Sequence, residues 1–224
     1  MMHLEHLNLL ACPVCQGPLT CDRSSADLAG GVVTEGCLSC AACRKQYPVV
    51  AGVPRFVPRE NYASGFGLEW TKHARTQYDS YSGIPASEQR FFSQTGWPRD
   101  MRGELILEVG SGSGRFTEQA AKTGATVVSL DYSYAVDANY ASNGARDNVL
   151  IVQADVFAMP FRPQTFDRLF CFGMLQHTPS PSRAFAALPK FLKPGGALCA
   201  DRPAAENRAV TTNFLIGVSG ISFG

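Results

Sequence analysis

The chain has 224 residues, with 20 basic and 19 acidic side chains and a formal net charge of +1. An apolar fraction of 45% suffices for at least one sizeable core. The near balance of basic and acidic side chains argues against non-specific nucleic-acid binding. No stretch approaches the roughly 20 apolar residues that cross a bilayer, and the first residues lack a signal-peptide pattern, so we expect a cytoplasmic protein.

Six of the eight cysteines lie within the first 43 residues. In a reducing compartment such a cluster is more often a metal site than a disulfide framework. The pair Cys12 and Cys15 recurs as Cys40 and Cys43 after a gap of 24 residues. Each CxxC pair places two thiolates on one metal, so the two pairs predict a tetrahedral Zn²⁺ site.

A competing CxxC pair is formed by Cys37 and Cys40. We favour Cys40 and Cys43, because Leu38 and Cys40 then alternate along a strand that leads into the knuckle. Cys21 and Cys37 remain as small apolar residues. Four thiolates leave no open position for water, so the zinc is expected to be structural, contributing roughly 10 kcal/mol or more of folding free energy.

Residues 7–58, with the pieces LLACPVC, LSCAACRKQ and YPVVAGVPRFV, resemble the small zinc-ribbon proteins that activate tRNA and other methyltransferases. The same module also occurs fused ahead of methyltransferase domains. We therefore predict a zinc-ribbon domain over residues 1–58.

Residues 59–102 mix bulky rings with polar groups and are predicted to form a helical linker. A helix is expected over 87–92, with Ser87 as a possible cap and Gly96 as its stop. This segment is either a pair of helices packed across the next domain or a lid that excludes water from a bound ligand.

From residue 105 onward, apolar runs alternate with amphipathic stretches. This order implies right-handed βαβ units. The predicted fold class of residues 103–224 is therefore α/β, a Rossmann-like parallel sheet with helices on both faces. The expected strands are 105–110, 126–131, 149–153, 166–172 and 197–201, and the expected helices are 115–123, 134–144 and 181–192.

The first of these strands ends in Glu108, which is followed by Gly110, Ser111 and Gly112. A glycine-rich turn before a helix lets a ligand approach the backbone. The dinucleotide pattern would need glycine at the position of Arg115. A carboxylate beside alternating glycines suits a ligand with an ammonium group and no pyrophosphate, which favours S-adenosylmethionine over NAD.

Two further acids end consecutive strands. Asp131 ends the second strand, where a carboxylate accepts both ribose hydroxyls, and Asp155 follows the third, where it can accept from an adenine amino group. Either acid alone fits a capping or turn role. Three acids at the carboxyl ends of consecutive strands favour a cofactor site, because open α/β sheets bind ligands there.

Residues 103–200 resemble class I S-adenosylmethionine-dependent methyltransferases in the pieces LEVGSGSGRF, SLDYS, VQADVFAMPF, FDRLFCFGMLQHTPSP and LKPGG. The resemblance implies that S-adenosylmethionine binds here. It further implies contacts from Glu108, Gly110, Ser111 and Gly112 to the methionine moiety, Asp131 and Tyr132 to the ribose, Asp155 and Val156 to the adenine, and Phe172 and Gly173 beside the sulfonium.

His177, just past the fourth strand, is the candidate catalytic residue. It would act as a general base if the acceptor carries a proton of high pKa. Alternatively, it caps or packs under the following helix. His73 and Tyr78 in the linker are weaker candidates.

Only 22 residues follow Arg202, fewer than the helix and two antiparallel strands that this fold adds after its fifth strand. The sequence therefore predicts a truncated sheet with strand 197–201 as an exposed edge, prone to self-association, and at most one more strand from LIGVSGISF.

The sequence favours methyl transfer to an unidentified small-molecule acceptor. A tRNA or rRNA methyltransferase is the first alternative. The near-neutral charge and the lack of an N/D-P-P-Y motif after the fourth strand weigh against it. A non-catalytic protein that binds cofactor, or a partner through the ribbon, is the second.

Overall fold

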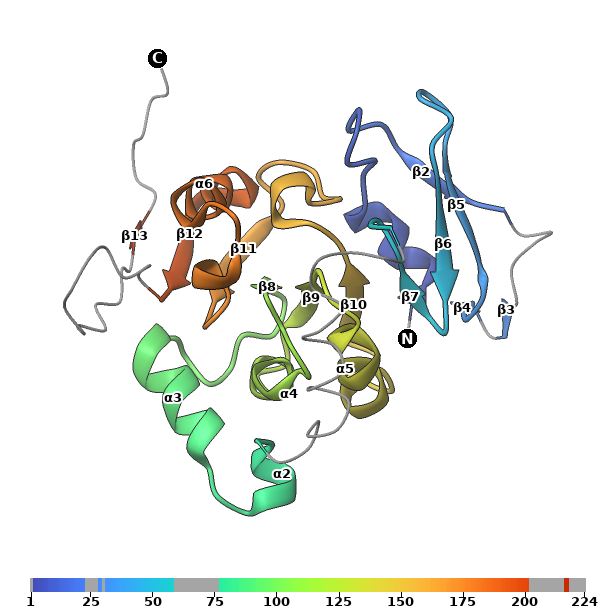
Figure 1. The fold of residues 1–224 in the computed structure, drawn as a ribbon. Helices are drawn as coiled ribbons and strands as arrows, with labels where there is room; N and C mark the ends of the chain where they lie inside the picture. The colour runs from blue at the N-terminus through green and yellow to red at the C-terminus, as the bar shows by residue number, and fades with distance from the viewer. Residues whose placement is uncertain (1, 23–27, 30, 59–76, 202–215, 218–224) are drawn as a thin grey trace.

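The structure is a computed structural model that describes residues 2–22, 28–29, 31–58, 77–201 and 216–217. It contains a small cysteine-rich part built from short antiparallel strands and a larger α/β part (Figure 1). Among the helices of these segments, none has the length and apolarity needed to cross a bilayer.

The cysteine-rich part holds a four-stranded antiparallel sheet in the order β2-β5-β6-β7 and a three-stranded sheet in the order β1-β4-β3. Along β6, Tyr47 and Val49 are buried between exposed neighbours, the period-two pattern of a strand with one covered face. The elements are β1 (Met2–His3), η1 (Leu4–Leu9), β2 (Leu19–Cys21), β3 (Leu28–Ala29), β4 (Val32–Val33), β5 (Gly36–Cys40), β6 (Gln46–Val50) and β7 (Val53–Pro54).

The α/β part confirms the predicted parallel sheet, with the strand order β10-β9-β8-β11-β12-β13. Its parallel strands are β8 (Leu105–Val109), β9 (Thr126–Asp131), β10 (Val149–Gln153), β11 (Phe166–Cys171) and β12 (Leu192–Ala200). All five residues of β10 are buried, as expected for a strand covered on both faces.

Helices α4 (Arg115–Lys122) and α5 (Ala135–Asn143) cover one face of the sheet, and α6 (Pro181–Ala187) covers the other (Figure 1). The expected helix 181–192 ends early, because a 3-10 turn η4 (Pro189–Phe191) intervenes and β12 starts at Leu192. Two more 3-10 turns, η2 (Val156–Ala158) and η3 (Leu175–His177), follow β10 and β11.

The described part of the linker holds α2 (Asp79–Ser82) and α3 (Ala86–Thr95). Helix α3 ends at Gly96 in the left-handed conformation, as expected. Ser87 is not its cap; the Asp79 carboxylate accepts instead from the backbone N–H groups of Ser87 and Glu88 at 2.8 and 2.7 Å. Whether residues 59–76 form a lid lies outside the described residues.

Strand β12, the fifth strand of the parallel sheet, is not exposed along its whole outer edge. Strand β13 (Ile216–Gly217) pairs antiparallel with β12, opposite Leu198 and Ala197. The expectation of a wholly exposed edge is therefore wrong at these two positions, because the chain after Asp201 returns to the same strand. The argument for self-association through that edge is weaker as a result.

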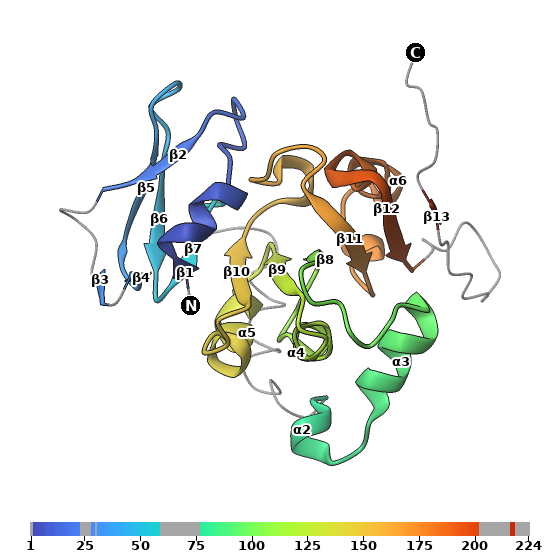
Figure 2. The same cartoon turned by 180° about the vertical axis from the view of Figure 1, so that it is seen from behind.

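The cysteine-rich part lies against the opposite edge of the sheet, with β7 beside β10 in both views (Figures 1 and 2). Arg55 forms a parallel bridge with Gln153, and the Phe56 N–H donates to the Gln153 carbonyl at 2.8 Å. A second bridge joins Leu10 to Phe161. Backbone hydrogen bonds therefore join the two parts, and one apolar cluster contains residues of both.

Candidate functional site

The turn after β8 is built for close backbone contact. Gly110 has φ 85°, and a Cβ there would lie 2.3 Å from the Cβ of Met174, so only glycine fits. Its N–H donates to the Leu130 carbonyl at 2.8 Å, and the Gly112 N–H donates to the Asp131 carboxylate at 2.8 Å. The turn is thus fixed to the end of β9.

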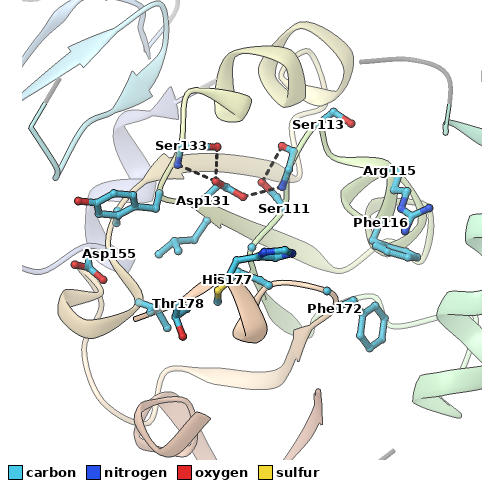
Figure 3. A pocket seen from close by; sticks show the side chains of 18 residues that line it. Ser111, Ser113, Arg115, Phe116, Asp131, Ser133, Asp155, Phe172, His177 and Thr178 are labelled. Carbon is cyan, nitrogen blue, oxygen red and sulfur yellow. Dashed lines mark hydrogen bonds between the residues drawn. The ribbon is translucent and has the colours of Figure 1, made fainter. Parts of the chain in front are cut away.

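A cavity of about 300 Å³ opens at this edge of the sheet. Figure 3 shows side chains from the ends of several strands around it. Of the residues predicted to bind cofactor or act in catalysis, those that line the cavity are Gly110, Ser111, Gly112, Asp131, Tyr132, Asp155, Val156, Phe172, Gly173 and His177.

Asp131 is held by its own turn as well as facing the cavity (Figure 3). One carboxylate oxygen accepts from the Ser133 N–H and hydroxyl at 2.8 and 2.7 Å, and the other accepts from the Gly112 N–H. A carboxylate offers about four acceptor positions. About one acceptor position therefore remains for a ligand. This suffices for one ribose hydroxyl, whereas the sequence led us to expect that Asp131 accepts from both.

Asp155 fulfils a capping role and still faces the cavity. One of its oxygens accepts from the Phe157 N–H at 2.9 Å and caps η2. Tyr132 and Val156 line the same cavity. Burial, with the charge of Asp155 nearby, raises the pKa of Tyr132.

Glu108 does not line the cavity, which departs from the expectation that it would contact the methionine moiety. Its carboxylate is buried and accepts from the hydroxyls of Thr117 and Ser129, and Asn139 donates to both hydroxyls at 3.0 and 2.9 Å. Burial raises the pKa of Glu108 to about 7. Glu108 therefore joins β8 to β9, α4 and α5 beneath the glycine-rich turn.

Tyr78, a weaker catalytic candidate, also supports that turn. Its buried hydroxyl donates to the Ser113 carbonyl and accepts from the Asn143 amide at 3.0 Å, and burial raises its pKa. Ser113 lines the cavity, while its hydroxyl is buried without a hydrogen-bond partner among the described residues. His73 lies outside the described residues.

The thiol groups of Cys12, Cys15, Cys40 and Cys43 lie within 4.8 Å of one another. Cys12 and Cys43, and likewise Cys15 and Cys40, are 3.5 Å apart at sulfur. Tetrahedral zinc with Zn–S bonds of about 2.3 Å needs sulfurs about 3.8 Å apart. The four predicted thiols are therefore confirmed to lie together in an arrangement consistent with a structural zinc.

Comparisons with known families match both parts of the chain. Residues 107–200 match the family model described as a methyltransferase domain, and residues 3–52 match the model described as Trm112p-like protein. The chain is therefore similar to methyltransferase domains over residues 107–200 and to Trm112p-like proteins over residues 3–52.

Individual relatives agree with this assignment. An uncharacterised chloroplastic methyltransferase of Arabidopsis thaliana is 26% identical over 220 residues, which cover 87% of this chain and 62% of that protein. Demethylmenaquinone methyltransferase of Thermobifida fusca is 33% identical over 99 residues, covering 43% and 42%. The chain thus spans less than two thirds of the length of these relatives.

The methyltransferase fold is also shared with a solved protein of Methanococcus maripaludis that is assigned as an S-adenosylmethionine-dependent methyltransferase. The TM-score is 0.51 at 19% identity, and the match covers 65% of this chain and 66% of that one.

His177 lies on η3, and its ring points into the cavity between Ser111 and Phe172 (Figure 3). Its Nε2 atom is 3.4 Å from the Gln176 amide nitrogen. Ser180, and not His177, is the N-cap residue of α6. The position suits a residue that meets an acceptor.

Sequence reasoning missed the role of Arg115, which it used only to exclude a dinucleotide. Arg115 starts α4, lines the cavity beside Phe116 and is partly buried, and its guanidinium lies 4.5 Å from the Phe116 ring centre. Burial and the neighbouring Arg90 lower its pKa. The charges of Asp79, Asp201 and Glu108 oppose this shift. The ion pairs found among the described residues do not include Arg115, so a negatively charged ligand group would meet a partly desolvated cation there.

Proposed function

We propose that this protein transfers the methyl group of S-adenosylmethionine to a small-molecule acceptor. The observation that carries the proposal is a single cavity at the carboxyl ends of β8 to β11, with the glycine-rich turn, Asp131 and Asp155 along its wall. Parallel α/β sheets bind ligands at this edge.

The residues present offer a partner for each part of the cofactor. Asp131 accepts one ribose hydroxyl with Tyr132 beside the ribose, and Asp155 and Val156 contact the adenine. The backbone of Gly110, Ser111 and Gly112 lies along the methionine moiety, and the Phe172 ring suits a neighbouring sulfonium cation. Arg115 binds the methionine carboxylate by a charge-assisted hydrogen bond.

The cofactor supplies an activated methyl group, so the protein contributes mainly alignment of the acceptor. His177 accepts the proton of the acceptor where that proton has a high pKa. Its place in the cavity, between Ser111 and Phe172, supports this role.

A small-molecule acceptor is favoured by the similarity to demethylmenaquinone methyltransferase and by the net charge of +1. We further infer that residues 1–58 are a zinc-bearing domain serving residues 103–224 in cis, with 59–102 as the linker. Four cysteines gathered to hold a metal suit a reducing compartment such as the cytoplasm.

The test is transfer of labelled methyl from S-adenosylmethionine to a metabolite extract and, separately, to an RNA pool. We expect label in the low-molecular-mass fraction, and its loss in Asp131→Ala. Label only in RNA would contradict the acceptor class. Cofactor binding without transfer to either pool would contradict catalysis itself.

A further inference from the structure

Gln153 connects the zinc-ribbon domain to the cofactor cavity. It is the last residue of β10 and is buried. Its carbonyl accepts from the Phe56 N–H at 2.8 Å, and its side-chain oxygen accepts from Arg55 Nη1 at 3.1 Å. Its side-chain NH₂ donates to the Tyr132 carbonyl at 3.1 Å. One amide side chain therefore lies between the ribbon tail and the residue that follows Asp131.

Arg55 also contacts the other side of that turn. Its Nη2 atom lies 2.5 Å from an Asp137 carboxylate oxygen and 3.5 Å from the Val50 carbonyl, and the Arg55 side chain is only 10% exposed. Asp137 sits in the first turn of α5, directly after the turn that carries Asp131. The planar fork of one guanidinium thus reaches the end of β10 and the start of α5, a geometry that lysine does not reproduce.

The Arg55 guanidinium determines the orientation of the Gln153 side-chain amide. An amide has one accepting and one donating end, and its orientation is set by its partners. With the oxygen toward Arg55, the NH₂ group faces the Tyr132 carbonyl. Next to it, the Ala154 N–H donates to the Asp131 carbonyl at 3.0 Å. The end of β10 therefore holds the backbone of both residues assigned to the ribose.

We propose that Arg55 is a positioning residue for the cofactor site, through which the docked zinc-ribbon domain raises the affinity of the methyltransferase domain for its adenosyl ligand. This inference rests on the proposed function of the cavity. Arg55 touches no ligand; it acts through Gln153 on the turn that carries Asp131 and Tyr132.

The first test measures binding of S-adenosylhomocysteine by calorimetry to the wild type, Arg55→Met and Arg102→Met. Arg102 pairs with Asp100 ahead of β8, a central strand of the sheet, and its side chain is 80% exposed, so its variant removes one charge away from the β10 edge. Coupling between sites typically spans about 5- to 150-fold, and we expect Arg55→Met to bind about fivefold more weakly or worse. Arg102→Met should match the wild type. An Arg55→Met affinity within about twofold of the wild type would overturn the inference.

A double variant separates positioning from general destabilisation. Because Arg55 and Asp131 act through the same turn, the losses of binding free energy caused by Arg55→Met and Asp131→Asn should be non-additive. Strictly additive losses would mean that Arg55 only stabilises the fold, and would refute the positioning role.

The wild-type protein offers an independent measurement, because coupling is reciprocal. Bound S-adenosylhomocysteine should slow hydrogen exchange at residues 53–56, whose backbone pairs with Gln153, and leave β5 unchanged. Equal exchange at 53–56 with and without ligand would refute the coupling. A wild type that binds no S-adenosylhomocysteine at all would instead contradict the proposed function on which the inference rests.

Discussion

Replacing Glu108 with glutamine should change how stability depends on pH. The carboxyl is buried, and its pKa of about 7 in the folded protein is set first by burial, against the opposing hydrogen bonds from Thr117 and Ser129. Asp131 raises this pKa further and Arg115 lowers it. In the unfolded chain the ordinary value is 4.5. Between these two values the folded protein keeps a proton that the unfolded chain releases.

The sign and the size follow from linkage. Since the folded state binds more protons, the free energy of unfolding falls as pH rises from about 4.5 to 7, and levels off above about 8. At 1.36 kcal/mol per pKa unit, the loss is about 3 kcal/mol. Glu108→Gln carries no charge and can still accept from Thr117 and Ser129. The variant should therefore gain up to about 3 kcal/mol over the wild type between pH 5 and pH 8.

Urea unfolding followed by fluorescence of the buried Trp97 measures this difference at several pH values. Groups shared by both proteins, including the thiols of the zinc site, cancel in the comparison. Asp167→Asn is the control: burial opposes the shift, but Lys193 and the Leu105 N–H hold the pKa of Asp167 below its ordinary value. Its stabilisation is lost only as pH falls below about 4, so its difference should stay flat from pH 5 to 8. A flat difference for Glu108→Gln would refute the account of that buried carboxyl.

Three further outcomes are expected. Metal analysis should find one zinc per chain, lost in Cys40→Ser with Cys43→Ser; zinc retained in that double variant would contradict the cluster. Gly52→Ala should destabilise the chain more than Gly83→Ala in thermal melts, because both glycines have positive φ but only at Gly52 would a Cβ lie 2.2 Å from the Tyr140 hydroxyl; equal melting temperatures would show that this contact does not hold the ribbon. Asp131→Ala should weaken S-adenosylmethionine binding by about 1.5–3 kcal/mol, the scale of one hydrogen bond to a charged group, and unchanged calorimetric affinity would exclude Asp131 from the site.

The sequence predicted the parts of the site that depend on local pattern. Glycines before a helix and acids at strand ends are local patterns, and spacing alone predicted that Gly110, Asp131 and Asp155 lie at the same edge of the sheet, where they line the cavity. In each CxxC pair the two thiols are only three residues apart, so the chain positions them locally. The four-cysteine zinc site could therefore be predicted without knowing how the two parts of the chain pack.

What the sequence did not predict depends on long-range contacts or on competition for hydrogen bonds. In β8 both Glu108 and its neighbours are buried, so the strand pattern could not show that Glu108 lies outside the cavity lining. Hydrogen bonds from Ser133 and Gly112 occupy most of the acceptor positions of the Asp131 carboxylate. These bonds depend on the folded turn and could not be read from the sequence. The Arg55–Gln153 contact joins residues 98 apart in the chain and has no local signature.

The central claim is that the cavity at the ends of β8 to β11 binds S-adenosylmethionine. Calorimetric titration of S-adenosylmethionine and of NAD into the purified protein tests it most directly. We predict saturable binding of one S-adenosylmethionine per chain and no binding of NAD. Binding of NAD, or no heat from S-adenosylmethionine at a folded, zinc-loaded protein, would contradict the claim.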